Sequence, residues 1–125
     1  MKKVAIIATG GTIAGTGQLG KTTSYRAGEI SVEDIILSIP LIKEVADIET
    51  IQLFNVDSNE MNPDKWIELS RVVNEVARRS DIDGIVVTHG TDTLDETAYY
   101  LNLTLYTQKP VVITGAMRPA TATSA

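Results

Sequence analysis

Three short apolar runs, each followed by glycine or hydroxyl residues, limit most strongly what this chain can fold into. They lie within residues 4–8, 83–88 and 109–114. A continuous apolar run of this length, without polar alternation, is typical of a strand that is buried on both faces of a parallel sheet. Residues 46–56 are a fourth strand candidate with poorer alternation. The sequence therefore predicts a mainly parallel sheet.

Helical patterns fill the intervals between these strands. Asn62 is a favourable N-cap residue, and apolar residues recur on one face of the helix that it begins. These residues are Trp66, Leu69, Val73 and Val76. A second helix pattern lies between residues 31 and 40, and Thr93 with Glu96 predicts a capping box at the start of a third helix. The alternation predicts a doubly wound α/β fold over residues 1–125, with helices flanking the sheet.

Composition excludes several classes of function. The 125 residues are 43% hydrophobic and carry a formal charge of −5 without a basic run, so we expect no nucleic acid and no anionic membrane as partner. With no cysteine and His89 as the only histidine, we expect neither an iron–sulfur cluster nor a histidine-based metal site. Apolar runs are too short for a membrane span or a signal-peptide core. The cytoplasm is the default prediction, although a mature periplasmic or secreted chain would have the same features.

Loops that follow strands are the places to search for chemistry, because ligands of such sheets bind beyond the carboxyl ends of the strands. In the first such loop, Gly10 and Gly11 let the backbone approach a bound group and present Thr12 at the sheet edge. A tight turn with local capping is the alternative interpretation. A second loop places Thr91 beside Asp92, at a helix start that needs a single capping residue. The surplus polar groups suit a site for a small zwitterion or a polarised water.

Three segments of the chain closely resemble the bacterial-type asparaginases and glutaminase-asparaginases. They are residues 8–15 (ATGGTIAG), 87–93 (VTHGTDT) and 115–119 (GAMRP). The resemblance implies an L-asparaginase that hydrolyses asparagine to aspartate and ammonia without a cofactor. It also implies that residues 1–125 are an incomplete amino-terminal catalytic domain of a two-domain protein, active as a homotetramer built as a dimer of dimers.

The resemblance further implies the catalytic roles. Thr12 would be the nucleophile that forms an acyl-enzyme, oriented or activated by Tyr25 on a mobile loop. Thr91 would position the hydrolytic water, working with a lysine. Backbone groups near Gly11 and Thr91 would hold the oxyanion, and the Ala116 carbonyl would receive the departing nitrogen. A threonine hydroxyl does need such activation, and glycine-rich loops supply amides for a developing oxyanion.

Substrate-binding residues are implied in the same way. Asp92 would hold the α-amino group and Ser58 the α-carboxylate, which is the charge pattern that a zwitterion requires. Asn59 stands where many members carry glutamine, one methylene longer, so asparagine would be preferred over glutamine. The family's lysine, and a carboxylate lent by a neighbouring subunit, fall beyond Ala125. We therefore expect residues 1–125 alone to be inactive.

Other interpretations of the same residues remain open at this stage. One is an amino-acid-binding module that keeps the site without the chemistry. Another is a nucleotide-binding protein, because residues 15–22 (GTGQLGKT) match the P-loop pattern, although they follow the predicted strand at a distance and precede a loop. His89 could suggest a serine–histidine–aspartate site, but a lone histidine at a strand end is more often a hydrogen-bonded structural residue.

Overall fold

The structure is a computed structural model that describes residues 1–17, 25–26 and 31–119. Its main feature is a four-stranded sheet in which all neighbouring strands are parallel, in the order β4-β1-β5-β6. These strands are β1 (Lys3–Gly10), β4 (Asp47–Val56), β5 (Gly84–Thr88) and β6 (Val111–Thr114). After β1 the chain adds β4 on one side of it and then β5 and β6 on the other. The predicted doubly wound α/β fold is therefore confirmed.

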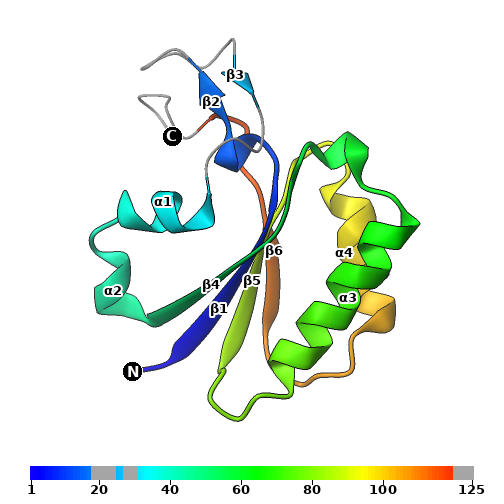
Figure 1. The fold of residues 1–125 in the computed structure, drawn as a ribbon. Helices are drawn as coiled ribbons and strands as arrows, with labels where there is room; N and C mark the ends of the chain where they lie inside the picture. The colour runs from blue at the N-terminus through cyan, green and yellow to red at the C-terminus, as the bar shows by residue number, and fades with distance from the viewer. Residues whose placement is uncertain (18–24, 27–30, 120–125) are drawn as a thin grey trace.

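Helices cover both faces of this sheet (Figure 1). On one face lie α3 (Pro63–Ala77) and α4 (Leu94–Thr104), and on the other lie α1 (Val32–Leu37) and α2 (Ile42–Val45). The larger core forms beneath α3, where Leu69 and Val73 are fully buried against the central strands. A smaller core joins Val32 of α1 to Ile6 of β1. Within the described part of the chain, no helix has the length and hydropathy to cross a membrane.

Two helix starts form as the sequence predicts. Asn62 precedes α3, and its side chain accepts a hydrogen bond from the Lys65 amide at 3.0 Å. Ser31 precedes α1, and its hydroxyl accepts from the Asp34 amide at 3.3 Å. Each cap satisfies an amide that the first helical turn leaves without a partner, and so it determines where the helix begins.

Two small elements differ from the prediction. Beyond Pro40, where a helix was expected to end, the chain forms the single-turn helix α2. Where a loop was expected, β2 (Thr16–Gly17) pairs antiparallel with β3 (Tyr25–Arg26). Neither element has enough residues for a recognisable periodicity, because one helical turn or one residue pair does not complete a pattern.

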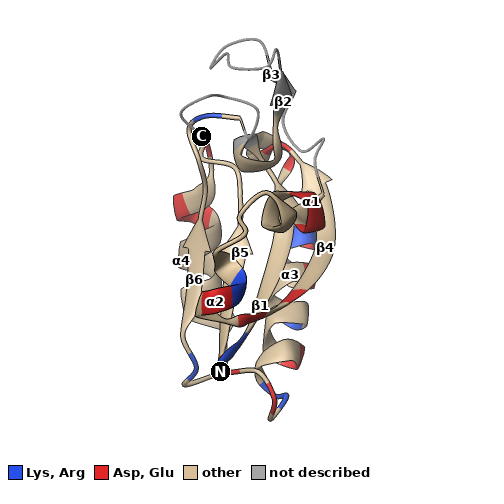
Figure 2. Cartoon of the chain, turned by 90° about the vertical axis from the view of Figure 1, so that its left-hand side faces the viewer, with Lys and Arg blue, Asp and Glu red and all other residues tan. Residues whose placement is uncertain are grey.

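Charged residues form ion pairs at the end of the sheet nearest the N-terminus (Figure 2). Arg79 donates hydrogen bonds to Glu49 and to Asp81, and Lys3 donates to Asp81 at 3.1 Å. Hydrogen bonding from Arg79 lowers the pKa of both Glu49 and Asp81 below their ordinary values. Lys109 also lies here, with its ammonium group 2.6 Å from the Arg79 carbonyl oxygen. These ionic contacts therefore lie at the opposite end of the sheet from the loops that follow the strands.

Candidate functional site

The loops that follow β4, β1, β5 and β6 meet at the carboxyl edge of the sheet. The Gly11 amide donates to the Val56 carbonyl oxygen at 2.8 Å, which ties the loop after β1 to the end of β4. The His89 amide donates to the Thr114 carbonyl oxygen at 2.9 Å, which ties the loop after β5 to the end of β6. Parallel strands bring their carboxyl ends to one edge, so residues far apart in the sequence become neighbours.

Glycines allow three of these loops to pack without a gap. A Cβ atom added at Gly11 would lie 2.4 Å from the Gly90 Cα, and one added at Gly90 would lie 2.6 Å from the Ser58 Cβ. Gly11 also has φ +83°, a conformation that side-chain-bearing residues rarely adopt. The loops after β1, β5 and β4 are therefore in backbone-level contact.

For Thr12 and Tyr25, which have central predicted roles, the structure describes the backbone but not the side chain. Thr12 opens a 3₁₀ turn (Thr12–Ala14) directly after Gly11, so its backbone follows the point of contact with Gly90. Tyr25 lies in β3, which pairs with β2. The side chains of Thr12 and Tyr25 lie outside the described residues. Their roles therefore stay predictions.

Ser58, Asp92 and Thr93 form a two-point contact between the loop after β4 and the loop after β5. Ser58 is 5% exposed, and its Oγ accepts a hydrogen bond from the Asp92 amide at 3.0 Å. The Thr93 hydroxyl donates to the Ser58 carbonyl oxygen at 2.7 Å. The predicted capping box was wrong, because Thr93 makes no side-chain cap and bonds across the loops instead. Sequence reasoning missed this role, because nothing local links residues that are 35 positions apart.

The remaining predicted substrate-binding residues lie at the same edge. Thr91 is half-buried, and its Cγ2 would be 3.2 Å from a Cβ added at Gly115. Asn59 is exposed in the 3₁₀ turn Ser58–Glu60 that follows β4. Ala116 is half-buried just after β6. The Asp92 residue is exposed, so the edge presents a carboxylate to solvent beside a buried serine.

His89 has a structural environment, as one of the two interpretations predicted. It is fully buried, with Nδ1 2.6 Å from the Gly90 carbonyl oxygen and Nε2 2.9 Å from the Thr97 hydroxyl. A carbonyl only accepts, so Nδ1 carries the proton and the neutral ring accepts at Nε2 from Thr97. Thr97 in turn accepts from the Trp66 indole at 2.8 Å. This chain of hydrogen bonds anchors the loop after β5 to α4 and α3.

Burial lowers the pKa of His89 below its ordinary value. We expect the free energy of unfolding to fall as the pH drops below about 6.5, because the unfolded chain then binds a proton that the folded chain resists. The slope is limited to about 1.4 kcal/mol per pH unit for one proton. Urea unfolding between pH 7.5 and 5.5 measures it, with His89→Gln as the comparison. Equal slopes in the two proteins would contradict this assignment.

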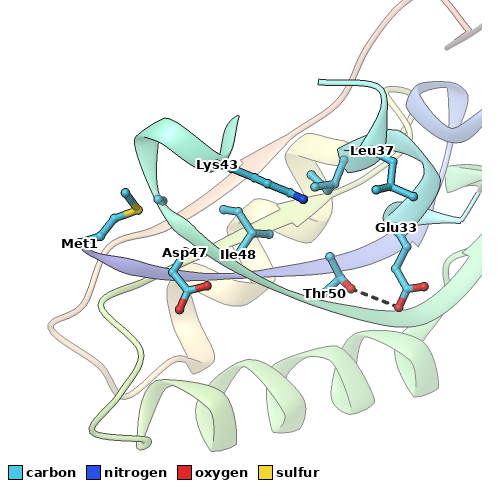
Figure 3. Close-up of a pocket in the computed structure, with 9 residues that line it drawn as sticks. Met1, Glu33, Leu37, Lys43, Asp47, Ile48 and Thr50 are labelled. Carbon is cyan, nitrogen blue, oxygen red and sulfur yellow. Dashed lines mark hydrogen bonds between the residues drawn. The ribbon is translucent and has the colours of Figure 1, made fainter. Parts of the chain in front are cut away.

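A hollow of about 610 Å³ lies elsewhere, away from the carboxyl edge of the sheet (Figure 3). The residues that line it include Glu33 of α1, Lys43 of α2, and Ile48 and Thr50 near the start of β4. Thr50 and Glu33 form a long hydrogen bond across it, at 3.4 Å. None of its lining residues comes from the loops after the strands. The convergent glycines and hydroxyls favour the carboxyl edge.

The P-loop pattern at residues 15–22 falls largely outside the described residues. Its described start enters β2, whose Thr16 and Gly17 pair with Arg26 and Tyr25. A phosphate-binding loop runs directly from a parallel strand of the sheet into a helix, and the first parallel strand here is followed by a 3₁₀ turn and β2 instead. The nucleotide-binding hypothesis gains no support from this arrangement.

Comparison with known proteins gives consistent similarities. Residues 3–125 match the family model described as Asparaginase, N-terminal. The chain is 46% identical to the "Probable L-asparaginase periplasmic" of Haemophilus influenzae, 48% identical to L-asparaginase 2 of Bacillus subtilis and 44% identical to the glutaminase-asparaginase of Pseudomonas aeruginosa. Each match covers all of this chain and 34–35% of the relative. The chain therefore spans about a third of the length of these curated relatives.

A solved structure agrees with these similarities. The "Probable Cytoplasmic L-asparaginase" of Campylobacter jejuni superposes with a TM-score of 0.95 at 47% sequence identity. That match covers 100% of this chain and 38% of the other. The fold and the sequence motifs thus point to the same family.

Proposed function

Because the chain belongs to the asparaginase family, through its N-terminal domain, we propose that it supplies catalytic residues of an L-asparagine amidohydrolase. The Thr12 hydroxyl attacks the carbonyl carbon of the side-chain amide, and ammonia leaves with the proton that the hydroxyl gives up. Water placed by Thr91 then attacks the acyl-enzyme and releases aspartate. A threonine acyl-enzyme replaces one difficult step by two easier ones.

One observation carries this proposal above the others. The loops after β1 and β5 touch at Gly11 and Gly90, and the next residues along these loops are Thr12 and Thr91. Two hydroxyl residues with separate predicted tasks, attack and water positioning, therefore follow a single point of backbone contact. Groups that act on one substrate must lie close together, and the backbone contact between Gly11 and Gly90 supports this arrangement.

Ser58 and Asp92, which contact each other across the two loops, are proposed to bind the charged end of the substrate. Because the Ser58 Oγ accepts from the Asp92 amide, its own proton is available to donate to an α-carboxylate. The exposed Asp92 carboxylate is available for the α-ammonium group. A zwitterion would thus receive a donor and an anion from residues that already contact each other. The shorter side chain of Asn59 favours asparagine over glutamine in this proposal.

The proposal places further active-site residues in the part of the relatives that this chain does not match. These are the lysine that works with Thr91 and the carboxylate of a neighbouring subunit, in a homotetramer. Lys109 does not take the lysine's role in the proposal, because its ammonium group is at the opposite end of the sheet. The cytoplasm remains the proposed compartment, and the relatives' names include both a periplasmic and a cytoplasmic asparaginase.

The test is ammonia release from L-asparagine and L-glutamine by the full-length protein and by Thr91→Val. We expect release from asparagine to exceed release from glutamine, and the variant to lose about 100-fold or more in kcat, the scale of a lost general acid–base contribution. Thr50→Val, in the hollow of Figure 3, is the matched control and should match the wild type. Aspartate binding by calorimetry without any ammonia release would instead support the binding-module interpretation.

A further inference from the structure

Thr93 is placed to control the position of Ser58 rather than to cap its own helix. Its hydroxyl donates to the Ser58 carbonyl oxygen at 2.7 Å, and no side-chain cap is formed at the start of α4. The Ser58 carbonyl also accepts from the Met61 amide at 3.1 Å, within the 3₁₀ turn. The turn therefore keeps its internal bond without Thr93. What Thr93 adds is the connection between this turn and the loop after β5.

The connection acts beside a second bond that runs between the same two loops. The Asp92 amide donates to the Ser58 Oγ, so the side chain and the carbonyl of Ser58 are each held by a residue of the loop after β5. With one bond alone, the turn could pivot about it, whereas two bonds set both distance and orientation. Gly90 also packs directly against Ser58, because a Cβ added at Gly90 would lie 2.9 Å from the Ser58 amide nitrogen.

We propose that Thr93 is a positioning residue that sets the spacing between the Ser58 hydroxyl and the Asp92 carboxylate, and thereby the affinity for an α-amino-acid zwitterion. This inference rests on the proposed function of the site. It assigns no contact between Thr93 and the substrate. Thr93 acts through Ser58, so its removal should affect binding of the charged end of the substrate more than the chemical step at the amide.

The test compares Thr93→Val with Thr93→Ser in the full-length protein. Valine keeps the branched shape and removes the donor, whereas serine keeps the donor. We expect Thr93→Val to raise KM for asparagine about fivefold with kcat little changed, the fold-change that corresponds to one neutral hydrogen bond. Thr93→Ser should stay within about twofold of the wild type. Unchanged unfolding midpoints verify that both variants are folded.

A double-mutant cycle with Ser58→Ala separates positioning from a general structural effect. In Ser58→Ala there is no hydroxyl for Thr93 to position. Thr93→Val should therefore no longer raise KM in that background. An equal rise in both backgrounds, or no rise in either, would overturn the proposal. If the wild type releases no ammonia, the proposed function fails by itself. The same cycle is then measured as Kd for L-aspartate, and a wild type that does not bind aspartate would overturn this inference as well.

Discussion

Thr12→Ala in the full-length protein is expected to lower kcat for asparagine hydrolysis by about 10⁴-fold or more. Removing the nucleophile of a covalent mechanism leaves only the contributions of binding and oxyanion stabilisation, and losses of this size are typical of acyl-transfer enzymes. The residue follows Gly11, whose contact with Gly90 brings the loops after β1 and β5 together. Coupled measurement of ammonia and aspartate over long incubations gives the range needed to quantify such a loss.

The control for this substitution is Thr12→Ser, which keeps a hydroxyl at the same position. We expect this variant to retain turnover that is readily measured, because its oxygen can still attack the amide. Aspartate affinity, measured by calorimetry, should change little in Thr12→Ala, since the proposed contacts to the charged groups come from Ser58 and Asp92. Ammonia release by Thr12→Ala at near the wild-type rate would refute the assignment of the nucleophile.

Gly11→Ala is expected to destabilise the fold by about 2–5 kcal/mol. Conversion of a left-handed backbone position to a residue with a Cβ costs about 1–2 kcal/mol, and overpacking in a filled region costs about 1–3 kcal/mol more. The overpacking cost applies because the new methyl group would lie 2.4 Å from the Gly90 Cα and amide nitrogen, which are backbone atoms without a rotamer to change. The loops after β1 and β5 must then separate.

That separation should also reduce catalysis. A shift of about 1 Å between catalytic groups can cost about 100-fold, so we expect kcat/KM to fall by at least that factor even in protein that stays folded. Urea unfolding gives the stability change, and assays at a temperature well below the unfolding midpoint give the change in activity.

Gly84→Ala provides the matched control. Gly84 is the first residue of β5, at the opposite end of this strand from the loop that contains Gly90. A Cβ added there would make an ordinary contact of 3.4 Å with the Pro110 ring. We expect its unfolding free energy to stay within about 1 kcal/mol of the wild type, because the substitution also reduces the entropy of the unfolded chain. Similar stability and activity in Gly11→Ala and Gly84→Ala would show that the contact between the loops is unimportant.

Much of the fold could be predicted because its determinants are local. The buried strands are continuous apolar runs, and the start of α3 follows from Asn62 accepting the Lys65 amide three residues later. In contrast, α2 and the β2–β3 pair are too short to produce a periodic signal. The order of the strands was not predicted, because pairing between β1 and β4 depends on packing across the sheet rather than on either segment alone.

For the candidate site, the sequence by itself determined which residues are proposed to carry the chemistry: the threonine after a glycine pair and the threonine–aspartate pair after a buried strand. It also supplied the motifs that indicate the family. Only the tertiary structure decided how these loops meet. The bond from Thr93 to Ser58, across 35 residues, replaced a predicted local cap, and His89 bonds to Thr97 of α4, the helix that follows it. Local patterns encode which backbone conformation a segment favours, whereas a hydrogen bond between loops forms only when the parallel strands have brought their carboxyl ends to one edge.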